Sequence, residues 1–388
     1  DRAFGPLAST VFGLGLWLSL LLKSAFALVG FGAYLAVLTD APVEPLAMGL
    51  LVGIIALNVV GVKKVGRAQS VVVAISLGGL AVLGTWSLVG SEARPLTEVL
   101  EPGLAELIAS VGLVYISYAG VTKIAAVAEE VRDPSRNLPL GMLLSLLIAS
   151  VLYSGVTWLM TTRIPAVELA GDLHPVYLLA REVTTPTVAV GFAVLAIATM
   201  VSMANAGLLA SSRFPFAMAR DGLLPPLLKD VHERYRTPLP AIFLTGLLMA
   251  VAILFLDVTS LAKLASSMMI AGFLAVNLAV IVLRESSTQW YRPTWRTPLY
   301  PLPQLAGVVI CVSLLVMLGW TGIGAFSAVA VVGLAVFLWI GRGSQRKGVL
   351  GRLGPRRDLL EIEQTSGPRG PVNALPTRAQ VVVPILGH

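Results

Sequence analysis

Small and hydroxyl-bearing residues interrupt an apolar run in the first third of this 388-residue sequence. Ser117, Tyr118, Ala119 and Gly120 follow the apolar residues that begin at Val114, and such residues favour local unwinding of a helix. Unwound backbone is tolerated at membrane depth only where protein or a water-filled cavity covers it. The freed carbonyl and amide groups suit a zwitterion, because carbonyls attract an ammonium group and a half-helix N-terminus attracts a carboxylate. The alternative is an intact helix with a glycine at a packing face.

Two lysines also lie within apolar runs, where ionisable side chains are expensive and are therefore functional candidates. Lys23 stands at the middle of its run, and a buried lysine with a depressed pKa exchanges protons near neutral pH, which makes it a coupling candidate. Lys123 lies within a turn of the interruption and is a proton-switching candidate, or a partner of Glu129 or Glu130. The alternatives are a structural ion pair or hydrogen bond for Lys23 and simple solvation in a vestibule for Lys123.

A third polar group falls in a later apolar run. Ser202 and Asn205 are coupling or gating candidates, since their oxygens are able to line a cation site or an access path. The alternative is that they form hydrogen bonds between packed helices.

The elements that position these residues are expected to be membrane-spanning helices. Hydrophobic residues make up 56% of the chain and charged residues 13%, and a bilayer core needs about 20 apolar residues per helix. The sequence therefore predicts an all-α polytopic membrane protein embedded in the lipid bilayer. The ten predicted spans are 11–38, 46–62, 69–90, 104–127, 138–161, 186–211, 238–256, 263–284, 303–320 and 321–340, the last two joined by a tight turn near Thr321-Gly322.

The basic residues concentrate in alternate loops, which is typical of topology rather than of nucleic-acid binding. The pI near 9.7 arises from clusters such as Lys63, Lys64 and Arg67, whereas the opposite loops carry only Arg94, Arg163, Arg181 and Lys263. The positive-inside rule then places both chain ends in the cytoplasm, in a multi-pass protein of the plasma (cytoplasmic) membrane. We expect no nucleic-acid partner.

Several kinds of chemistry have no support in the sequence. Cys311 is the only cysteine, and the three histidines are scattered over loops and the tail, so no metal site is expected. We find no nucleophile with a base, no paired catalytic carboxylates and no phosphate-binding loop. The sequence predicts a protein that is not an enzyme and has no cofactor.

Composition changes sharply after Gly341, which predicts three regions. Residues 1–341 form the membrane domain, and 342–376 read as a basic cytoplasmic linker near anionic headgroups. Residues 377–388 contain Gln380-Val-Val-Val-Pro-Ile-Leu, which resembles the first strand of a universal stress protein domain. The alternative for this end is a disordered apolar tail.

Four blocks in order resemble the amino acid, polyamine and organocation transporter superfamily. They are Arg2-Ala-Phe-Gly-Pro-Leu, Leu57 to Gln69, Ser117 to Pro139 with Ala128-Glu-Glu-Val-Arg-Asp-Pro, and Ala210-Ser-Ser-Arg to Pro225. The resemblance implies two inverted five-helix repeats followed by two helices, with alternating access around a midplane site. The ten spans then correspond to family helices three to twelve, and the first two family helices are absent from this chain.

The resemblance also implies which residues bind substrate. By motif position, Ile116, Ser117, Tyr118 and Val121 line the pocket beside Ala119 and Gly120, although the family usually has an aromatic residue where Ile116 and Val121 stand. Lys123 is not a general family feature. Because the family's first helix holds the substrate carboxylate, we expect a groove beside residues 117–121 and no transport by the 388-residue chain alone.

The implied function is secondary active transport of an amino acid or related amine, coupled to a proton or sodium gradient or working by exchange. Two alternatives stay open at this point. One is an ion-coupled inorganic ion transporter of the same architecture, and the other is a non-transporting membrane sensor.

Overall fold

The computed structural model describes residues 3–61, 65–89, 131–286 and 297–340, with residues 110–112, 114, 115, 117, 118 and 120 between them. Helices account for nearly all of the described residues, and none of these residues is in a β-strand. The helices are α1 (Pro6–Thr39), α2 (Val43–Val60), α3 (Val65–Val89), α6 (Pro134–Arg163), α7 (Ala166–Leu169), α8 (Pro175–Val183), α9 (Pro186–Arg220), η2 (a 3-10 helix, Pro226–Lys229), α10 (Leu239–Phe255), α11 (Val258–Glu285), α12 (Leu302–Met317) and α13 (Gly319–Trp339). The predicted all-α fold class is confirmed.

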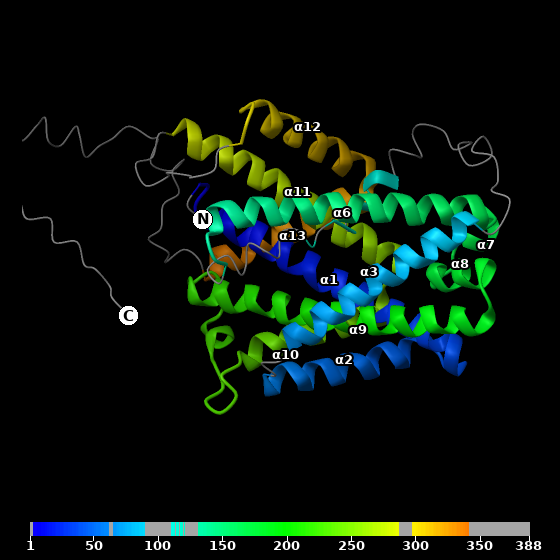
Figure 1. Cartoon of the computed structure of the whole chain (residues 1–388). Helices are drawn as coiled ribbons and strands as arrows, with labels where there is room; N and C mark the ends of the chain where they lie inside the picture. The colour runs from blue at the N-terminus through cyan, green and yellow to red at the C-terminus, as the bar shows by residue number, and fades with distance from the viewer. Residues whose placement is uncertain are drawn as a thin grey trace, which may run out of the picture.

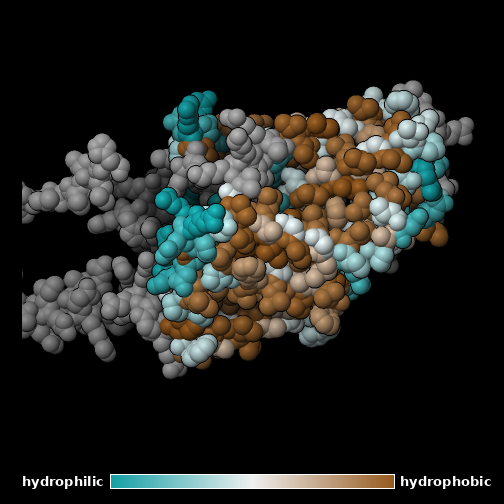
Figure 2. Space-filling view, turned by 90° about the horizontal axis from the view of Figure 1, so that it is seen from below, coloured by the Kyte–Doolittle hydropathy of each residue, from teal (hydrophilic) through white to brown (hydrophobic). Residues whose placement is uncertain are grey.

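The long helices run roughly side by side, with the connections gathered at two ends (Figure 1). Seven of the described helices are long and apolar enough to cross a membrane, and α10 and α12 are shorter apolar helices of 17 and 16 residues. A hydrophobic band separates hydrophilic ends on the face shown in Figure 2. The chain is therefore an integral, multi-pass membrane protein. Most of the predicted span 104–127, and the predicted linker and strand beyond residue 341, lie outside the described residues.

Helix α1 is the central element of the bundle. Its 34 residues are apolar on all sides, as expected for a helix surrounded by others, and it packs most extensively against α9 and α11. Ser19 Oγ donates a hydrogen bond to the carbonyl of Ala265 in α11 at 2.8 Å, and Trp17 Nε1 donates to Thr245 Oγ1 in α10 at 3.2 Å. These bonds tie α1 to the two neighbours that follow α9 in the sequence.

Helices α1 and α9 are in close contact where Ser24 meets Gly207. A Cβ atom built on Gly207 would lie 1.9 Å from Ser24 Oγ and 2.8 Å from Ser24 Cβ. Ser24 is buried, and its Oγ donates to the carbonyl of Leu20 within α1. Glycine at 207 therefore lets two helix backbones pack closely, which is common between membrane helices.

Two element boundaries differ from the sequence prediction. The break between the last two spans falls at Leu318 and Gly319, not at Thr321-Gly322, because Gly319 takes the left-handed conformation with φ 72°. Helix α9 runs on to Arg220, through Pro215, well past the predicted span end at residue 211. The turn expected at Asp221-Gly222 follows directly, and Gly222 has φ 75°.

The connection between α6 and α9 contains two helices that the apolar runs did not predict. Helix α8 buries Leu178 and Leu179 against Ile164 and Leu83, in a small core separate from the main one. This core fixes the segment from Gly171 to His174 beside the end of α1, as the lining of the pocket described below shows.

Helix α11 begins with a side-chain cap. The carboxylate of Asp257 accepts hydrogen bonds from the Ser260 N–H at 3.1 Å and from Ser260 Oγ at 2.5 Å. These bonds favour the charged form and so lower the pKa of Asp257 below its usual value.

Candidate functional site

The helix containing the predicted substrate stretch changes geometry there. Residues 110–112 and Val114 are α-helical, whereas Tyr115, Ser117, Tyr118 and Gly120 are in the tighter 3-10 conformation. A 3-10 turn inside a longer helix changes which carbonyls are bonded and often marks a functional hinge. The predicted site residues Ile116, Ala119 and Val121 lie outside the described residues.

Aromatic contacts place this stretch between α6 and α11. The ring of Tyr118 meets Tyr153 of α6 edge to face at 5.3 Å between centroids, and Tyr115 meets Phe273 of α11 in the same manner at 5.7 Å. Ser117 and Gly120 are exposed, and a Cβ on Gly120 would meet no atom within 4 Å. Ser117 and Gly120 therefore face open space, while Tyr115 and Tyr118 pack on neighbouring helices.

The coupling and gating candidates fall on two central helices. Lys23 is half-buried in α1, and Ser202 is half-buried in α9. Asn205 of α9 is buried and accepts a 2.9 Å hydrogen bond from Asn58 Nδ2 of α2. This is the interhelical bond that the alternative interpretation expects, while the gating role stays a prediction. Lys123 and Glu129 lie outside the described residues.

A small cavity lies between α1, α3, α8 and α9, which we call the Ser76–Thr199 cavity. Its volume is about 130 Å³, and its polar lining consists of Tyr34, Ser76 and Thr199 among apolar residues. The hydroxyls of Ser76 and Thr199 lie 2.6 Å apart and share a hydrogen bond. Three hydroxyls at this depth suit water or another small neutral polar molecule. In the sequence these three hydroxyl residues lie in three separate apolar runs. Nothing in the sequence indicates that they come together.

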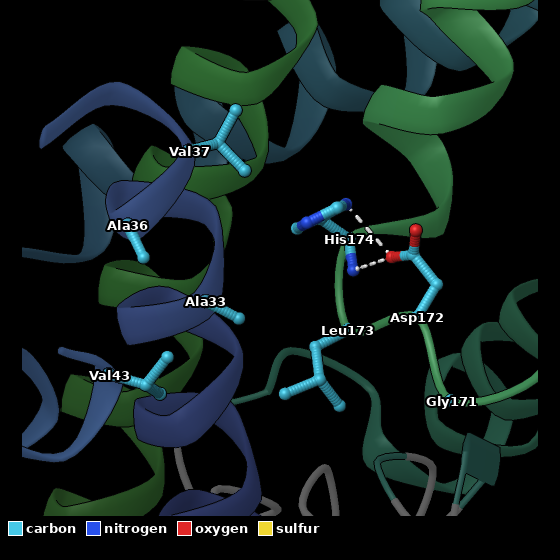
Figure 3. A pocket seen from close by; sticks show the side chains of 8 residues that line it. All are labelled: Ala33, Ala36, Val37, Val43, Gly171, Asp172, Leu173 and His174. Atoms are coloured by element: carbon cyan, nitrogen blue, oxygen red, sulfur yellow. Dashed lines mark hydrogen bonds and ion pairs between the residues drawn. The ribbon is translucent and has the colours of Figure 1, made fainter. Parts of the chain in front are cut away.

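A larger and more open pocket lies at the C-terminal end of α1, which we call the Asp172 pocket (Figure 3). Its volume is about 380 Å³. The lining residues are Ala33, Ala36, Val37, Val43, Gly171, Asp172, Leu173 and His174. Asp172 Oδ1 accepts a hydrogen bond from the His174 main-chain N–H at 2.5 Å and lies 2.8 Å from His174 Nδ1. Sequence reasoning treated this segment as an ordinary loop, although Asp172 and His174 stand directly before a helix-starting proline.

Tyr34 connects the two spaces. Tyr34 is one of the residues that line the Ser76–Thr199 cavity, and its ring meets His174 of the Asp172 pocket edge to face at 6.3 Å. Its hydroxyl accepts a 3.2 Å hydrogen bond from the Val176 N–H. The N-terminus of α8 is thereby held on α1. Among the described residues, no three histidine, cysteine or acidic side chains come together as a metal ion would require.

Comparison with known proteins adds a family-level likeness. The family model described as amino acid permease matches residues 1–341. A branched-chain amino acid permease of Bacillus subtilis (strain 168) is 28% identical over 298 residues, which cover 76% of this chain and 63% of the relative. A methylthioribose transporter of the same organism is 31% identical over 330 residues, 82% of this chain and 68% of the relative.

A plant protein is similar as well. A vacuolar cationic amino acid transporter 2 of Arabidopsis thaliana is 30% identical over 251 residues, covering 63% of this chain and 39% of the relative. The matched part of the chain thus spans about two fifths to two thirds of the length of these relatives.

Proposed function

Because this chain belongs to the amino acid permease family, we propose that it supplies most of the membrane helices of a secondary transporter for amino acids or related amines. The observation that carries the proposal is the family match, which extends over all the described helices. The relatives' names include branched-chain amino acids, cationic amino acids and methylthioribose, so these are the substrates to test first.

The proposed architecture follows the family helices. Residues 1–341 are the membrane domain and correspond to helices three to twelve of an inverted-repeat fold that works by alternating access. The central position of α1 between α9 and α11 supports a rigid scaffold against which other helices move. Both chain ends face the cytoplasm of a plasma-membrane protein. This orientation is supported by the α9–α10 connection, with Arg220, Lys229, Arg234 and Arg236, which lies at the same end of the bundle as the start of α1 (Figure 1).

The proposed substrate site is the stretch 115–120, in which Tyr115, Ser117, Tyr118 and Gly120 are in the 3-10 conformation. The change from α to 3-10 hydrogen bonding alters which carbonyl and amide groups are paired at this point, and Ser117 and Gly120 are exposed. Tyr118 and Tyr153 supply an aromatic edge for the substrate side chain. The ammonium and carboxylate of an amino acid bind backbone groups, so the aromatic edge selects among side chains.

Coupling is proposed to use a proton or sodium gradient, or exchange of one substrate for another. Lys23 is the proton-coupling candidate because it is half-buried at the middle of the central helix. A proton-driven cycle needs such a group to gain and lose a proton between the two access states.

The test is uptake of radiolabelled leucine, arginine and methylthioribose by proteoliposomes that contain the full-length protein. We expect saturable uptake of at least one substrate, reduced by Tyr118→Leu and unchanged by the matched variant Tyr235→Leu, whose tyrosine lies in the α9–α10 connection. Salt-dependent ion flux without uptake of any organic substrate would favour the inorganic ion transporter. Neither uptake nor flux would favour the sensor.

A further inference from the structure

The Asp172 pocket has one charged wall and one apolar wall. The apolar wall comes from Ala33, Ala36 and Val37 of α1 together with Val43 at the start of α2. The charged wall is the Gly171–His174 segment, from which the side chains of Asp172 and His174 project toward each other beside α1 (Figure 3). At about 380 Å³ the pocket holds a small organic molecule, since one water takes about 30 Å³ in the liquid.

The carboxylate of Asp172 is held in place and partly removed from water. Its side chain is 11% exposed, and the His174 N–H fixes Oδ1. Within the part of the chain that the structure describes, Oδ2 receives no hydrogen bond, and Asp172 is one of the residues that line the pocket. A partly desolvated carboxylate with a free oxygen attracts a cation more strongly than one in bulk water does.

The geometry of the free oxygen selects the kind of cation. A guanidinium group binds carboxylates best through both oxygens at once, whereas an ammonium group is a point charge that needs only one. Because Oδ1 is already bonded within the loop, a monodentate ammonium fits better than a bidentate guanidinium. The facing alanine and valine side chains suit a short alkyl group on that ammonium.

The imidazole of His174 lies beside the carboxylate and two tyrosine rings. Its Nδ1 lies 2.8 Å from Asp172 Oδ1, and its ring meets those of Tyr34 of α1 at 6.3 Å and Tyr177 of α8 at 5.8 Å. The α1 and α2 residues across the pocket are uncharged, so Asp172 is the acidic side chain that lines it.

We propose that the Asp172 pocket is a second binding site, for a small primary alkylammonium ion. The ammonium binds Asp172 Oδ2, and its alkyl chain lies against α1. The site shares no residue with the 115–120 stretch and is independent of the transport proposal.

Calorimetric titration of the full chain in lipid nanodiscs with n-butylammonium chloride tests the proposal. Near pH 7.5 we expect saturable binding, none with the neutral isostere n-butanol, and weaker binding of n-butylguanidinium. Asp172→Asn keeps an accepting oxygen but removes the negative charge, and it weakens binding by about tenfold or more, because hydrogen bonds between charged groups are stronger than neutral ones. The matched variant Asp230→Asn changes an exposed acid in the α9–α10 connection and leaves binding unchanged.

A further variant keeps the result interpretable if Asp172→Asn folds poorly. Val37→Trp fills the pocket from α1 and abolishes binding. The proposal is overturned if wild type shows no saturable binding, if Val37→Trp binds as wild type does, or if guanidinium binds as tightly as ammonium.

Uptake is measured separately, on proteoliposomes that contain the full-length protein, and separates the two proposals. Lost uptake with intact n-butylammonium binding would overturn only the transport proposal, and lost binding with intact uptake would overturn only this one.

Discussion

Gly207→Ala should destabilise the bundle at the contact between α1 and α9. The added Cβ would lie 1.9 Å from Ser24 Oγ and 2.8 Å from Ser24 Cβ, and real Cβ contacts under 3.0 Å essentially never occur. Rotating the Ser24 hydroxyl relieves the first overlap but leaves the second, so α1 and α9 must move apart. Because this is the most extensive helix pair in the described chain, we expect a cost of about 1–3 kcal/mol, as for other overpacked cores.

A second substitution should reverse most of that loss. Ser24→Gly removes both overlapping atoms, and the next atom, Ser24 Cα, lies 3.6 Å from the new Cβ, an ordinary contact. We therefore expect the Ser24→Gly/Gly207→Ala double variant to be more stable than Gly207→Ala. If the two sites were independent, the effects of the two single substitutions would simply add.

The assay is the melting temperature of the purified full chain in detergent, followed by size-exclusion chromatography of heated samples. Gly191→Ala is the matched control on the same helix, since a Cβ there meets nothing within 4 Å. We expect this control to be neutral or slightly stabilising, because alanine favours helix over glycine. A double variant no more stable than Gly207→Ala, or equal losses at Gly191 and Gly207, would refute the packing argument.

Three further predictions concern polar residues. Asn205→Ala should lower the free energy of unfolding by about 1 kcal/mol, and so lower the melting temperature modestly, because the hydrogen bond from Asn58 is lost. If uptake per folded molecule stays unchanged in this variant, Asn205 is a structural residue and not a gating residue. The usual pKa of an aspartate carboxyl is about 4, and Asp257 should stabilise α11 fully above that pH. The stabilisation should be lost as the pH falls through the lowered pKa of Asp257 in the folded protein, because a protonated carboxyl accepts the Ser260 hydrogen bonds more weakly. Melting temperatures measured against pH should show this acid-dependent loss in wild type and not in Asp257→Asn. Lys23→Met should abolish the pH dependence of uptake, and an unchanged pH profile would leave Lys23 a structural residue.

Span positions were predictable because apolar length is a local property of the sequence. Nine of the ten predicted runs coincide with described helices, and the glycine turn after α9 was expected from Asp221-Gly222. The break at Gly319 was misplaced because hydropathy continues unchanged through it, and only backbone conformation distinguishes it from Gly322.

Partners across the bundle were not predictable from one sequence. The polar type of Asn205 was recognised, but its bond to Asn58 depends on how α2 and α9 pack. The pairing of Asp172 with His174 is local, yet its position against α1 depends on the small core beneath α8. Helix α8 itself was missed because it is too short and too polar to register as a membrane span.

Gradient-driven accumulation tests the central claim most directly. Proteoliposomes containing the full-length protein are loaded without substrate, and an inward proton or sodium gradient, or a load of unlabelled substrate, is imposed before radiolabelled amino acid is added. The proposed secondary transport predicts that the concentration of label inside the vesicles transiently exceeds the concentration outside. In a gradient-driven cycle the label then falls back when an ionophore collapses the gradient. In exchange, the label does not accumulate in vesicles that were not loaded with unlabelled substrate. Label that never rises above the external concentration under any of these conditions would contradict it.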